Sequence, residues 1–596
     1  MNTHLLAPRR CLLALLLVCT FTSACEDDDP PSRAADYAEL KKNVERELPL
    51  AMKQDEVRGV SLALVDGDEV VWSQGFGMAD AEAGLPATPR TVYGLGSVAK
   101  VFTTSAAMRL VEEKRASLDQ PIEEVIPGFS MEARFPSAPV TLRTLLMHHA
   151  GIPEQMGGAY SPRALTLEER VASLRGEHRV WPVGTLHAYS NTGFIIAGRA
   201  VETASGSDFG AFMQKHLFTP LRMAHSAFRV TPAVAELRAK GYGDLPPETV
   251  PPHWIESEGP AGGMFSSAED LSRFVRMLLN GGRFEGRQVL RSESIQEMWR
   301  EQNAGNPLDV GTRSGLTWYL HDLPLEGGGA VRMVEHDGSD FQFNAIVALI
   351  PEHRLGVVVL SNTLSAGSLV NSLARQMLAQ ALKVKTGKVV APVPGLPSVS
   401  PEPQPPEVLA RWEGLYSTDL GPMVIQVQGG ALKGLAGDTV LDLVPHQQGY
   451  FKTLVGEEPL WLSFRRAGDA TLLLGHSPLH GVGLLGTRIT PAPMPEVWRS
   501  RLGRYTVATE GSRELLDEAV LSEVSGLLVL TYTGPLYRGL QVTMVLDPEG
   551  DLAAVAGRGR HRGDVLRFEQ TAEGAWLRLK GVRLRRVPSL ATAHDL

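Results

Sequence analysis

Two pairs of β-rich runs stand at opposite ends of a long region with helical periodicity. The first pair, residues 60–77, surrounds an Asp-Gly-Asp turn, which is typical of a β-hairpin. The second pair consists of residues 343–350 and 355–362, joined by a short polar turn. Between the pairs, apolar residues recur at helical spacing, most clearly in residues 269–280. The pattern predicts one α+β domain over residues 37–390, whose sheet combines strands from both ends.

A proline-rich stretch, residues 391–408, separates this domain from a region of different character. Such a composition predicts a stiff linker. Beyond it, short β runs alternate with glycine turns, which predicts an all-β region. The phrases RWEGLYST and RLGRYTV place Tyr416 and Tyr505 89 residues apart. Two similar small β-barrel domains, 409–494 and 495–596, are one interpretation, and chance resemblance of a short motif is the alternative.

The first 24 residues have the pattern of an export signal. Arg9 and Arg10 precede an apolar run that is too short to span a bilayer, which takes about 20 residues. Cys25 follows directly and begins an acidic segment, residues 25–36, interpreted as a tether. We therefore expect an exported protein, periplasmic or displayed at the cell surface.

The sequence TSAC at the end of this signal resembles the lipobox of bacterial lipoproteins, in which the final cysteine is lipidated. Cys25 would then anchor the chain to a membrane. The alternative is ordinary cleavage that leaves Cys25 as a free thiol. All three cysteines lie within the first 25 residues, so a mature chain that retains only Cys25 has no intramolecular disulfide.

Charge and composition exclude one class of partner. The net charge is −9, with 43% hydrophobic and 21% charged residues, as in an ordinary globular protein. Binding of nucleic acid requires basic patches that neutralise phosphates. We therefore expect a small-molecule or peptide substrate and no nucleic acid, while the sequence leaves the oligomeric state open.

A serine and a lysine stand three residues apart where a glycine loop meets a helical pattern. Helical geometry would place Ser97 and Lys100 one turn apart on the same face, so that their side chains can meet. A serine hydroxyl needs a base to become a nucleophile. The first helical turn also offers unpaired N–H groups that can stabilise an oxyanion. One S-x-x-K match is weak evidence by itself.

Two further elements support it: Tyr189-Ser190-Asn191, and His336-Asp337-Gly338 followed by Ser339. With these the chain resembles the serine β-lactamase and penicillin-binding-protein superfamily, especially the branch of class C β-lactamases, D-aminopeptidases and esterases. Framework phrases at residues 141–152, 181–185 and 260–274 resemble that branch too. The resemblance implies a β-lactamase-like fold, an antiparallel sheet flanked by helices, and a serine hydrolase that needs no cofactor.

The resemblance also implies residue roles. Ser97 attacks the carbonyl, Lys100 shares its proton, and Tyr189 is the phenolic base. Asn191 orients the lysine and the substrate amide. The backbone N–H groups of Ser97 and Ser339 form the oxyanion hole.

The third element departs from the K-T-G of most relatives, whose lysine helps recognise a substrate carboxylate. His336 is expected to be mostly neutral at pH 7, which suits a carboxylated β-lactam less well. We expect His336, Asp337 and Gly338 to contact substrate, although Asp337 is equally compatible with a solvated strand position. No metal site is expected, because His148-His149 lacks the further ligands of a known metal motif.

The sequence thus predicts a hydrolase that cleaves an amide or ester through an acyl-serine intermediate. D-amino-acid peptides and small esters are the candidate substrates. A β-lactamase or D,D-carboxypeptidase is an alternative. A non-catalytic protein that senses or binds acyl groups is another.

Overall fold

A computed structural model gives the structure of the chain. It describes residues 36–133, 135–136, 138–156, 163–243, 258–392, 397–418, 421–437, 439–455, 458–477, 481–508, 516, 518–534, 541–558, 562–579 and 582–587. The predicted export signal, Cys25 and nearly all of the acidic tether lie outside the described residues.

The N-terminal domain is built on one antiparallel sheet of seven strands, in the order β10-β11-β12-β13-β1-β2-β3. Val60 of β1 pairs with Ser361 of β13, so segments from the two ends of the domain lie side by side, as predicted. The hairpin β1–β2 turns at Gly67, which has a positive φ of 64°. The strands are β1 (Gly59–Asp66), β2 (Glu69–Asp80), β3 (Leu85–Pro86), β10 (Tyr319–Pro324), β11 (Ala330–Ser339), β12 (Asn344–Ile350) and β13 (Leu355–Ser361).

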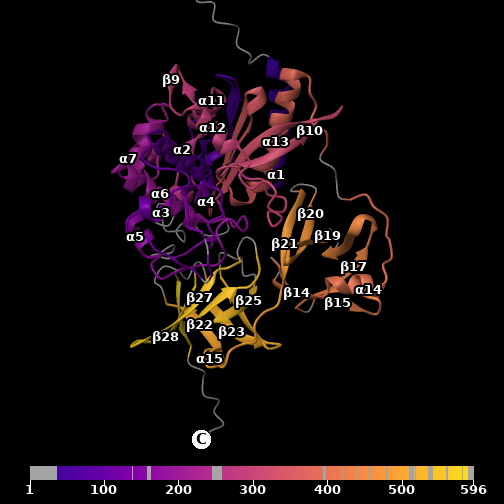
Figure 1. The fold of residues 1–596 in the computed structure, drawn as a ribbon. Helices are drawn as coiled ribbons and strands as arrows, with labels where there is room; N and C mark the ends of the chain where they lie inside the picture. The colour runs from indigo at the N-terminus through magenta and orange to yellow at the C-terminus, as the bar shows by residue number, and fades with distance from the viewer. Residues whose placement is uncertain are drawn as a thin grey trace, which may run out of the picture.

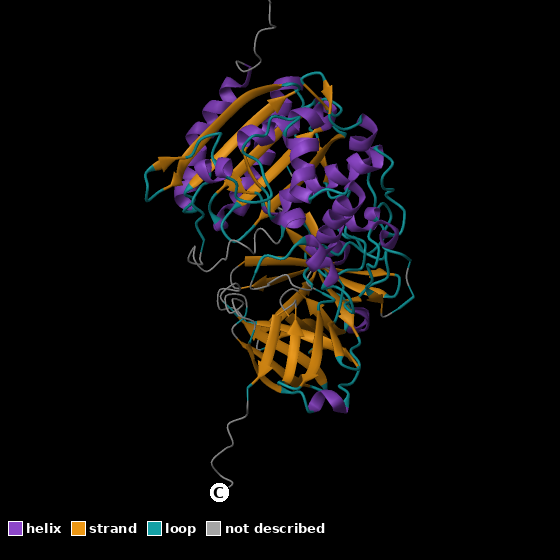
Figure 2. Ribbon diagram, turned by 90° about the vertical axis from the view of Figure 1, so that its left-hand side faces the viewer, coloured by secondary structure: helices purple, strands orange, loops and turns teal. Residues whose placement is uncertain are grey.

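Helices cover both faces of this sheet (Figure 2). On one face, α1 (Ala38–Gln54) and α13 (Gly367–Thr386) enclose an apolar core with the sheet. On the other face, α11 (Ala268–Leu279) packs on β1 and β13. Next to it, α2 (Ala99–Glu112) packs against α6 (Asn191–Ser205), and these helices share a second, larger core. Strands at both ends and helices in the middle confirm the predicted α+β class.

Shorter elements complete the N-terminal domain. They are β4 (Val92–Gly94), η2 (Gly96–Val98), α3 (Ile122–Val125), β5 (Glu132–Ala133), α4 (Leu142–Leu146), α5 (Leu167–Ala172), β6 (His178–Arg179), α7 (Phe209–Met213), η3 (Gln214–Phe218), α8 (Pro232–Leu237), α10 (Gly259–Gly262), β7 (Phe265–Ser267), β8 (Arg283–Phe284), β9 (Arg287–Gln288), α12 (Ser292–Trp299), η5 (Pro351–His353) and η6 (Leu364–Ala366).

The C-terminal region forms two closed eight-stranded barrels, which confirms the predicted all-β architecture. Barrel 1 consists of β14 (Gly414–Thr418), β15 (Gly421–Gln428), β16 (Ala431–Ala436), β17 (Thr439–Pro445), β18 (Tyr450–Val455), β19 (Glu458–Ala467), β20 (Ala470–Ser477) and β21 (Gly481–Ile489). Barrel 2 consists of β22 (Gly503–Val507), β23 (Glu518–Val524), β24 (Leu527–Thr533), β25 (Val542–Glu549), β26 (Leu552–Val555), β27 (Val565–Thr571), β28 (Gly574–Leu579) and β29 (Val582–Arg586). The residue boundaries between the domains stay predictions.

The two barrels begin alike. Short helical segments precede each first strand: α14 (Pro406–Leu409), η7 (Ala410–Trp412) and α15 (Glu496–Arg499), with η8 (Gln447–Gly449) inside barrel 1. Tyr416 donates its hydroxyl proton to the carbonyl of Trp412 at 2.9 Å, and Tyr505 donates to Arg501 at 2.5 Å. The shared tyrosine, four residues after its acceptor in each case, favours internal duplication over chance resemblance.

Both barrels touch the N-terminal domain (Figure 1). Arg465 of barrel 1 donates to the carbonyl of Pro307 at 2.6 Å, and Arg567 of barrel 2 donates to the carbonyl of Gly176. Phe341, in the turn between β11 and β12, packs against the core of barrel 2. Barrel 2 is therefore in contact with the turn that ends β11.

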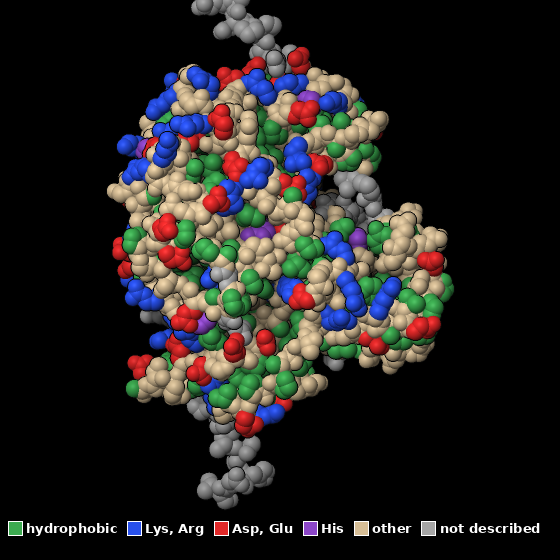
Figure 3. All heavy atoms as spheres, viewed as in Figure 1, with side chains coloured by type: hydrophobic (Ala, Val, Ile, Leu, Met, Phe, Trp, Pro, Cys, Tyr) green, Lys and Arg blue, Asp and Glu red, His purple; other side chains and the backbone are tan. Residues whose placement is uncertain are grey.

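The visible surface mixes charges of both signs. On the face shown in Figure 3, basic and acidic side chains are interspersed across the N-terminal domain. None of the described helices is long and apolar enough to cross a membrane.

Candidate active site

Ser97 lies at the start of a helix, held by a short two-stranded pairing. Strand β4 pairs with β7, and the backbone N–H of Leu95 donates to Met264 at 2.9 Å. The chain then turns through Gly96 at a φ of +49° into η2 and α2. A β-carbon on Gly96 would lie 2.7 Å from the backbone nitrogen of Ser339. Glycine is needed here because both the backbone conformation and the close approach exclude a side chain.

Lys100 is fully buried directly behind Ser97. Its amine donates to Ser97 Oγ at 3.1 Å, to Asn191 Oδ1 at 2.7 Å and to the carbonyl of Ala261 at 2.6 Å. A buried amine is costly unless its protons are accepted, so these three contacts account for its burial. They also join α2, α6 and α10 around one nitrogen atom.

Tyr189 contacts the same serine from the other side. Its hydroxyl lies 2.5 Å from Ser97 Oγ, and the Lys100 amine lies 4.7 Å from the centre of its ring. The imidazole of His148 stacks on the phenol, with ring centres 4.4 Å apart and planes 28° from parallel. Ser97 Oγ therefore lies between an amine and a phenol.

The start of α6 fixes the positions of Tyr189 and Asn191. Ser190 is the N-cap, and its hydroxyl accepts from the N–H of Gly193 at 3.0 Å. The backbone N–H of Ser190 donates to His148 Nδ1 at 3.0 Å. Burial holds the pKa of His148 well below its usual range, so its neutral ring is suited to accept this bond.

Strand β11 runs past Ser97 at very short range. A β-carbon on Gly338 would lie 2.1 Å from the carbonyl oxygen of Leu95 and 2.8 Å from the nitrogen of Ser97. Only glycine allows this approach. Asp340 fixes the turn that follows, because its Oδ1 accepts from the N–H groups of Gln342 and Phe343 at 2.8 and 2.7 Å. Burial raises the pKa of Asp340 to about 6.

His336 is buried on the same side of β11 as Gly338, since side chains two apart share a face. Burial lowers the pKa of His336 to about 4, an effect to which the charge of Lys100 adds. The imidazole is therefore neutral at pH 7. Its Nδ1 lies 2.6 Å from the carbonyl oxygen of Asp337.

Asp337 is exposed on the opposite face of the strand. Glu335, which shares that face, forms an ion pair with Arg375 of α13, the helix that covers the sheet on the side away from Ser97. The structure thus brings Ser97, Lys100, Tyr189, Asn191, His336, Gly338 and Ser339 together but leaves Asp337 apart. This placement favours the solvated interpretation of Asp337.

Sequence reasoning missed two contributors to the site. One is the carbonyl of Ala261, which has no side-chain signal. The other is His148, which sequence reasoning considered only as a metal candidate. Its backbone has a positive φ of 61°, and its ring stacks on the phenol of Tyr189. Its neighbour His149 points to Asp309, with 2.7 Å between Nε2 and Oδ2. Among the described residues no group of three potential metal ligands gathers.

The geometry provides the parts of a nucleophilic hydrolase. A serine hydroxyl contacts both a phenol and an amine, and its own N–H and that of Ser339 belong to backbone segments in close contact. Such an arrangement can transfer an acyl group to serine and stabilise the oxyanion formed in that step.

Comparison with known proteins points to one family. The sequence model of the β-lactamase family matches residues 44–382. Penicillin-binding protein 4 of Amycolatopsis lactamdurans is 30% identical over 378 residues, covering 61% of this chain and 94% of that protein. An unguisins hydrolase from Aspergillus violaceofuscus is 28% identical over 356 residues, covering 55% of this chain. The chain spans only 62% of the length of that hydrolase.

Solved structures agree on the fold. The crystal structure of SurE with D-Leu has a TM-score of 0.56 at 22% identity, covering 75% of this chain and all of that one. The penicillin-binding protein homologue of Pyrococcus abyssi, described as octameric, has a TM-score of 0.51 at 24% identity and covers the same share of this chain. At these identities the likeness concerns the fold alone.

We expect Gly338→Ala to slow labelling of Ser97 by a fluorophosphonate about 10²-fold, because the added methyl pushes β11 away from the serine turn. Labelling is followed by intact-mass spectrometry. The matched control is Gly483→Ala in barrel 1, where a β-carbon meets nothing within 4 Å. Equal labelling rates for the two variants would contradict the tight approach of β11.

Proposed function

Because the chain belongs to the β-lactamase family of serine hydrolases, we propose that it cleaves an amide or ester bond through a covalent acyl-Ser97 intermediate. The observation that carries the proposal is the position of Ser97 Oγ, 3.1 Å from the Lys100 amine and 2.5 Å from the Tyr189 hydroxyl. A serine hydroxyl in contact with a phenol that can take its proton, and with an amine that can stabilise the resulting charge, is prepared for nucleophilic attack.

The hydrogen-bond partners of Lys100 bear on which group takes that proton. Asn191 Oδ1 and the carbonyl of Ala261 can only accept, so they take two N–H donors of the amine. The third position faces Ser97 Oγ. Three acceptors favour an ammonium, whose charge in turn favours a phenolate on Tyr189. Tyr189 is thus assigned as the base and Lys100 as the cation that stabilises it.

Acylation then proceeds in two steps. Ser97 Oγ bonds to the substrate carbonyl carbon, its proton passes to Tyr189, and the carbonyl electron pair becomes an oxyanion held by the N–H groups of Ser97 and Ser339. Collapse of this intermediate breaks the bond to the leaving amine or alcohol. The leaving group departs with the proton from Tyr189.

Deacylation repeats the same proton transfers with water. Tyr189 accepts a proton from the water that attacks the acyl carbon, and Ser97 Oγ leaves with that proton. A carboxylic acid is released and the serine is restored. If water cannot reach the acyl group, the same residues form a stable acyl-enzyme, which is the chemistry of the alternative sensor or binding protein.

The environment of His336 bears on substrate choice. Its pKa of about 4 leaves a neutral imidazole where many relatives carry a lysine. A neutral group offers no ion pair to a substrate carboxylate. This favours D-amino-acid peptides or small esters over the carboxylated substrates of a β-lactamase or D,D-carboxypeptidase.

We further propose that the protein is exported and anchored through a lipid on Cys25. The support is the sequence alone: a short apolar run after Arg9 and Arg10, followed by TSAC and an acidic segment.

Hydrolysis assays with a D-alanine p-nitroanilide, a p-nitrophenyl butyrate ester and benzylpenicillin test the proposal. We expect turnover of the anilide or the ester, loss of that turnover in Ser97→Ala, and a decrease of about 10²- to 10⁴-fold in Tyr189→Phe. Turnover that survives in folded Ser97→Ala would overturn the assignment of the nucleophile. Turnover of penicillin alone would support the β-lactamase alternative.

Substitution at His336 tests the basis of substrate choice. We expect His336→Lys to speed acylation by benzylpenicillin at least tenfold, because a charge-assisted hydrogen bond to the carboxylate contributes about 1.5–3 kcal/mol. The control is His336→Gln, which stays neutral and should leave penicillin acylation unchanged. Both rates are measured as the appearance of the penicilloyl adduct by mass spectrometry. Identical rates in the two folded variants would contradict the role given to this position.

A further inference from the structure

The duplicated barrels allow the chain to be compared with itself. Residues 406–416, PEVLARWEGLY, align without a gap with residues 495–505, PEVWRSRLGRY. Each segment leads into the first strand of its barrel, and the alignment pairs Tyr416 with Tyr505. It pairs Leu409 with Trp498 and Trp412 with Arg501. These two pairs differ in size and charge at one end of each barrel.

In barrel 2 this end is filled. Trp498 is fully buried, and its indole N–H donates to the carbonyl of Gly550 at 3.0 Å. Arg501 is only 5% exposed, with its guanidinium 4.7 Å from the Trp498 ring centre and 4.0 Å from that of Phe568. An ion pair joins Arg501 to Asp551. Trp498 and Arg501 thus connect the segment before the first strand to the turn between the fourth and fifth strands.

In barrel 1 the same end is open. Leu409 is smaller than tryptophan, and Trp412 turns its ring onto Phe464 instead, with ring centres 5.1 Å apart and planes 14° from parallel. Phe464 and Phe568 both belong to the sixth strand of their barrels. The turn between the fourth and fifth strands spans residues 446–449, whereas barrel 2 has only Gly550 and Asp551 there. A cavity of about 410 Å³ results.

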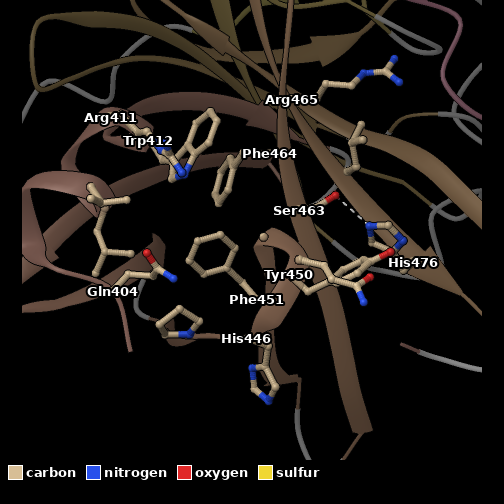
Figure 4. Close-up of a pocket in the computed structure, with 16 residues that line it drawn as sticks. Gln404, Arg411, Trp412, His446, Tyr450, Phe451, Ser463, Phe464, Arg465 and His476 are labelled. Atoms are coloured by element: carbon tan, nitrogen blue, oxygen red, sulfur yellow. Dashed lines mark hydrogen bonds between the residues drawn. The ribbon is translucent and has the colours of Figure 1, made fainter. Parts of the chain in front are cut away.

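The cavity has an aromatic interior and a polar side (Figure 4). Trp412, Phe464 and Phe451 form the aromatic part. On the other side, Ser463 Oγ lies 2.8 Å from His476 Nε2. Burial lowers the pKa of His476, which favours a neutral imidazole at pH 7.

The charged side chains that line the cavity are the arginines Arg411 and Arg465. Arg411 lines the cavity and is exposed, and its guanidinium lies 4.8 Å from the Trp412 ring centre. Arg465 also belongs to the lining, but its guanidinium turns away to Pro307. The described residues that line the cavity include no aspartate or glutamate. A negatively charged ligand would therefore meet a positive charge, and no carboxylate, among these lining residues.

We propose that this end of barrel 1 is a binding site for a small aromatic carboxylate. An aromatic ring fits beside Trp412 and Phe451, where offset stacking and edge contacts are favourable. The carboxylate extends to Arg411, and the Ser463–His476 pair offers hydrogen bonds to a neutral polar substituent. The volume lies within the range of small-molecule sites, and the mouth of a barrel is a common place for one. The site is separate from Ser97 and does not rest on the proposed hydrolase activity.

Isothermal titration of the full chain with 2-naphthoate tests the site. We expect one molecule to bind per chain, and the neutral isostere 2-naphthylmethanol to bind at least tenfold more weakly. Leu409→Trp introduces the residue that fills barrel 2, so we expect at least a tenfold loss of naphthoate affinity.

Two arginine variants keep the test decisive if Leu409→Trp does not fold. Arg411→Gln should remove the preference for naphthoate over the alcohol. The matched control Arg465→Gln should preserve that preference, because its guanidinium faces away. No binding by the folded chain, or unchanged binding in folded Leu409→Trp, would overturn the proposal. Equal effects of the two arginine variants would overturn the assigned position of the carboxylate.

Discussion

The burial of one amine organises the centre of the N-terminal domain. Lys100 has no exposed surface, and an amine removed from water needs acceptors for its protons. Those acceptors come from three places: the serine one turn earlier, the first residue of α6, and a backbone carbonyl of α10. Because they are far apart in sequence, the site exists only when all three segments have packed. Correct folding and a competent Ser97 are thus physically linked.

The sequence was sufficient to predict the parts of this site that depend on local pattern. Alternating and helical periodicities identified both hairpins and α11, and the S-x-x-K spacing brought Ser97 and Lys100 into contact. The sequence could not predict contacts made by backbone atoms, such as the hydrogen bond that the carbonyl of Ala261 accepts. Asp337 shows a different limit. Side chains alternate along a strand, so the sequence allows Asp337 to lie on either face of the sheet. Only the packing of β11 against η2 decides which face it takes.

The barrels show how one motif can lead to two outcomes. The two entry segments share a tyrosine bonded four residues back, and each opens a closed eight-stranded barrel. Differences within the entry segment then change the end of each barrel. In barrel 2, Trp498 and Arg501 fill this end. In barrel 1, Leu409 and Trp412 leave it open. The sequence indicated that the barrels are duplicated. Predicting that one barrel end is filled and the other is open required the positions of these side chains relative to the strands.

The proposed reaction depends on Ser97 as the residue that carries the acyl group. Rapid mixing of the chain with a p-nitrophenyl ester, an acid quench and peptide mapping by tandem mass spectrometry would locate the acyl mass directly. We expect one acyl group per chain, on the peptide that contains Ser97, and more of this acyl-enzyme in conditions that slow deacylation. An acyl group found on another residue, or turnover of the ester with no acyl-enzyme at any mixing time, would contradict it.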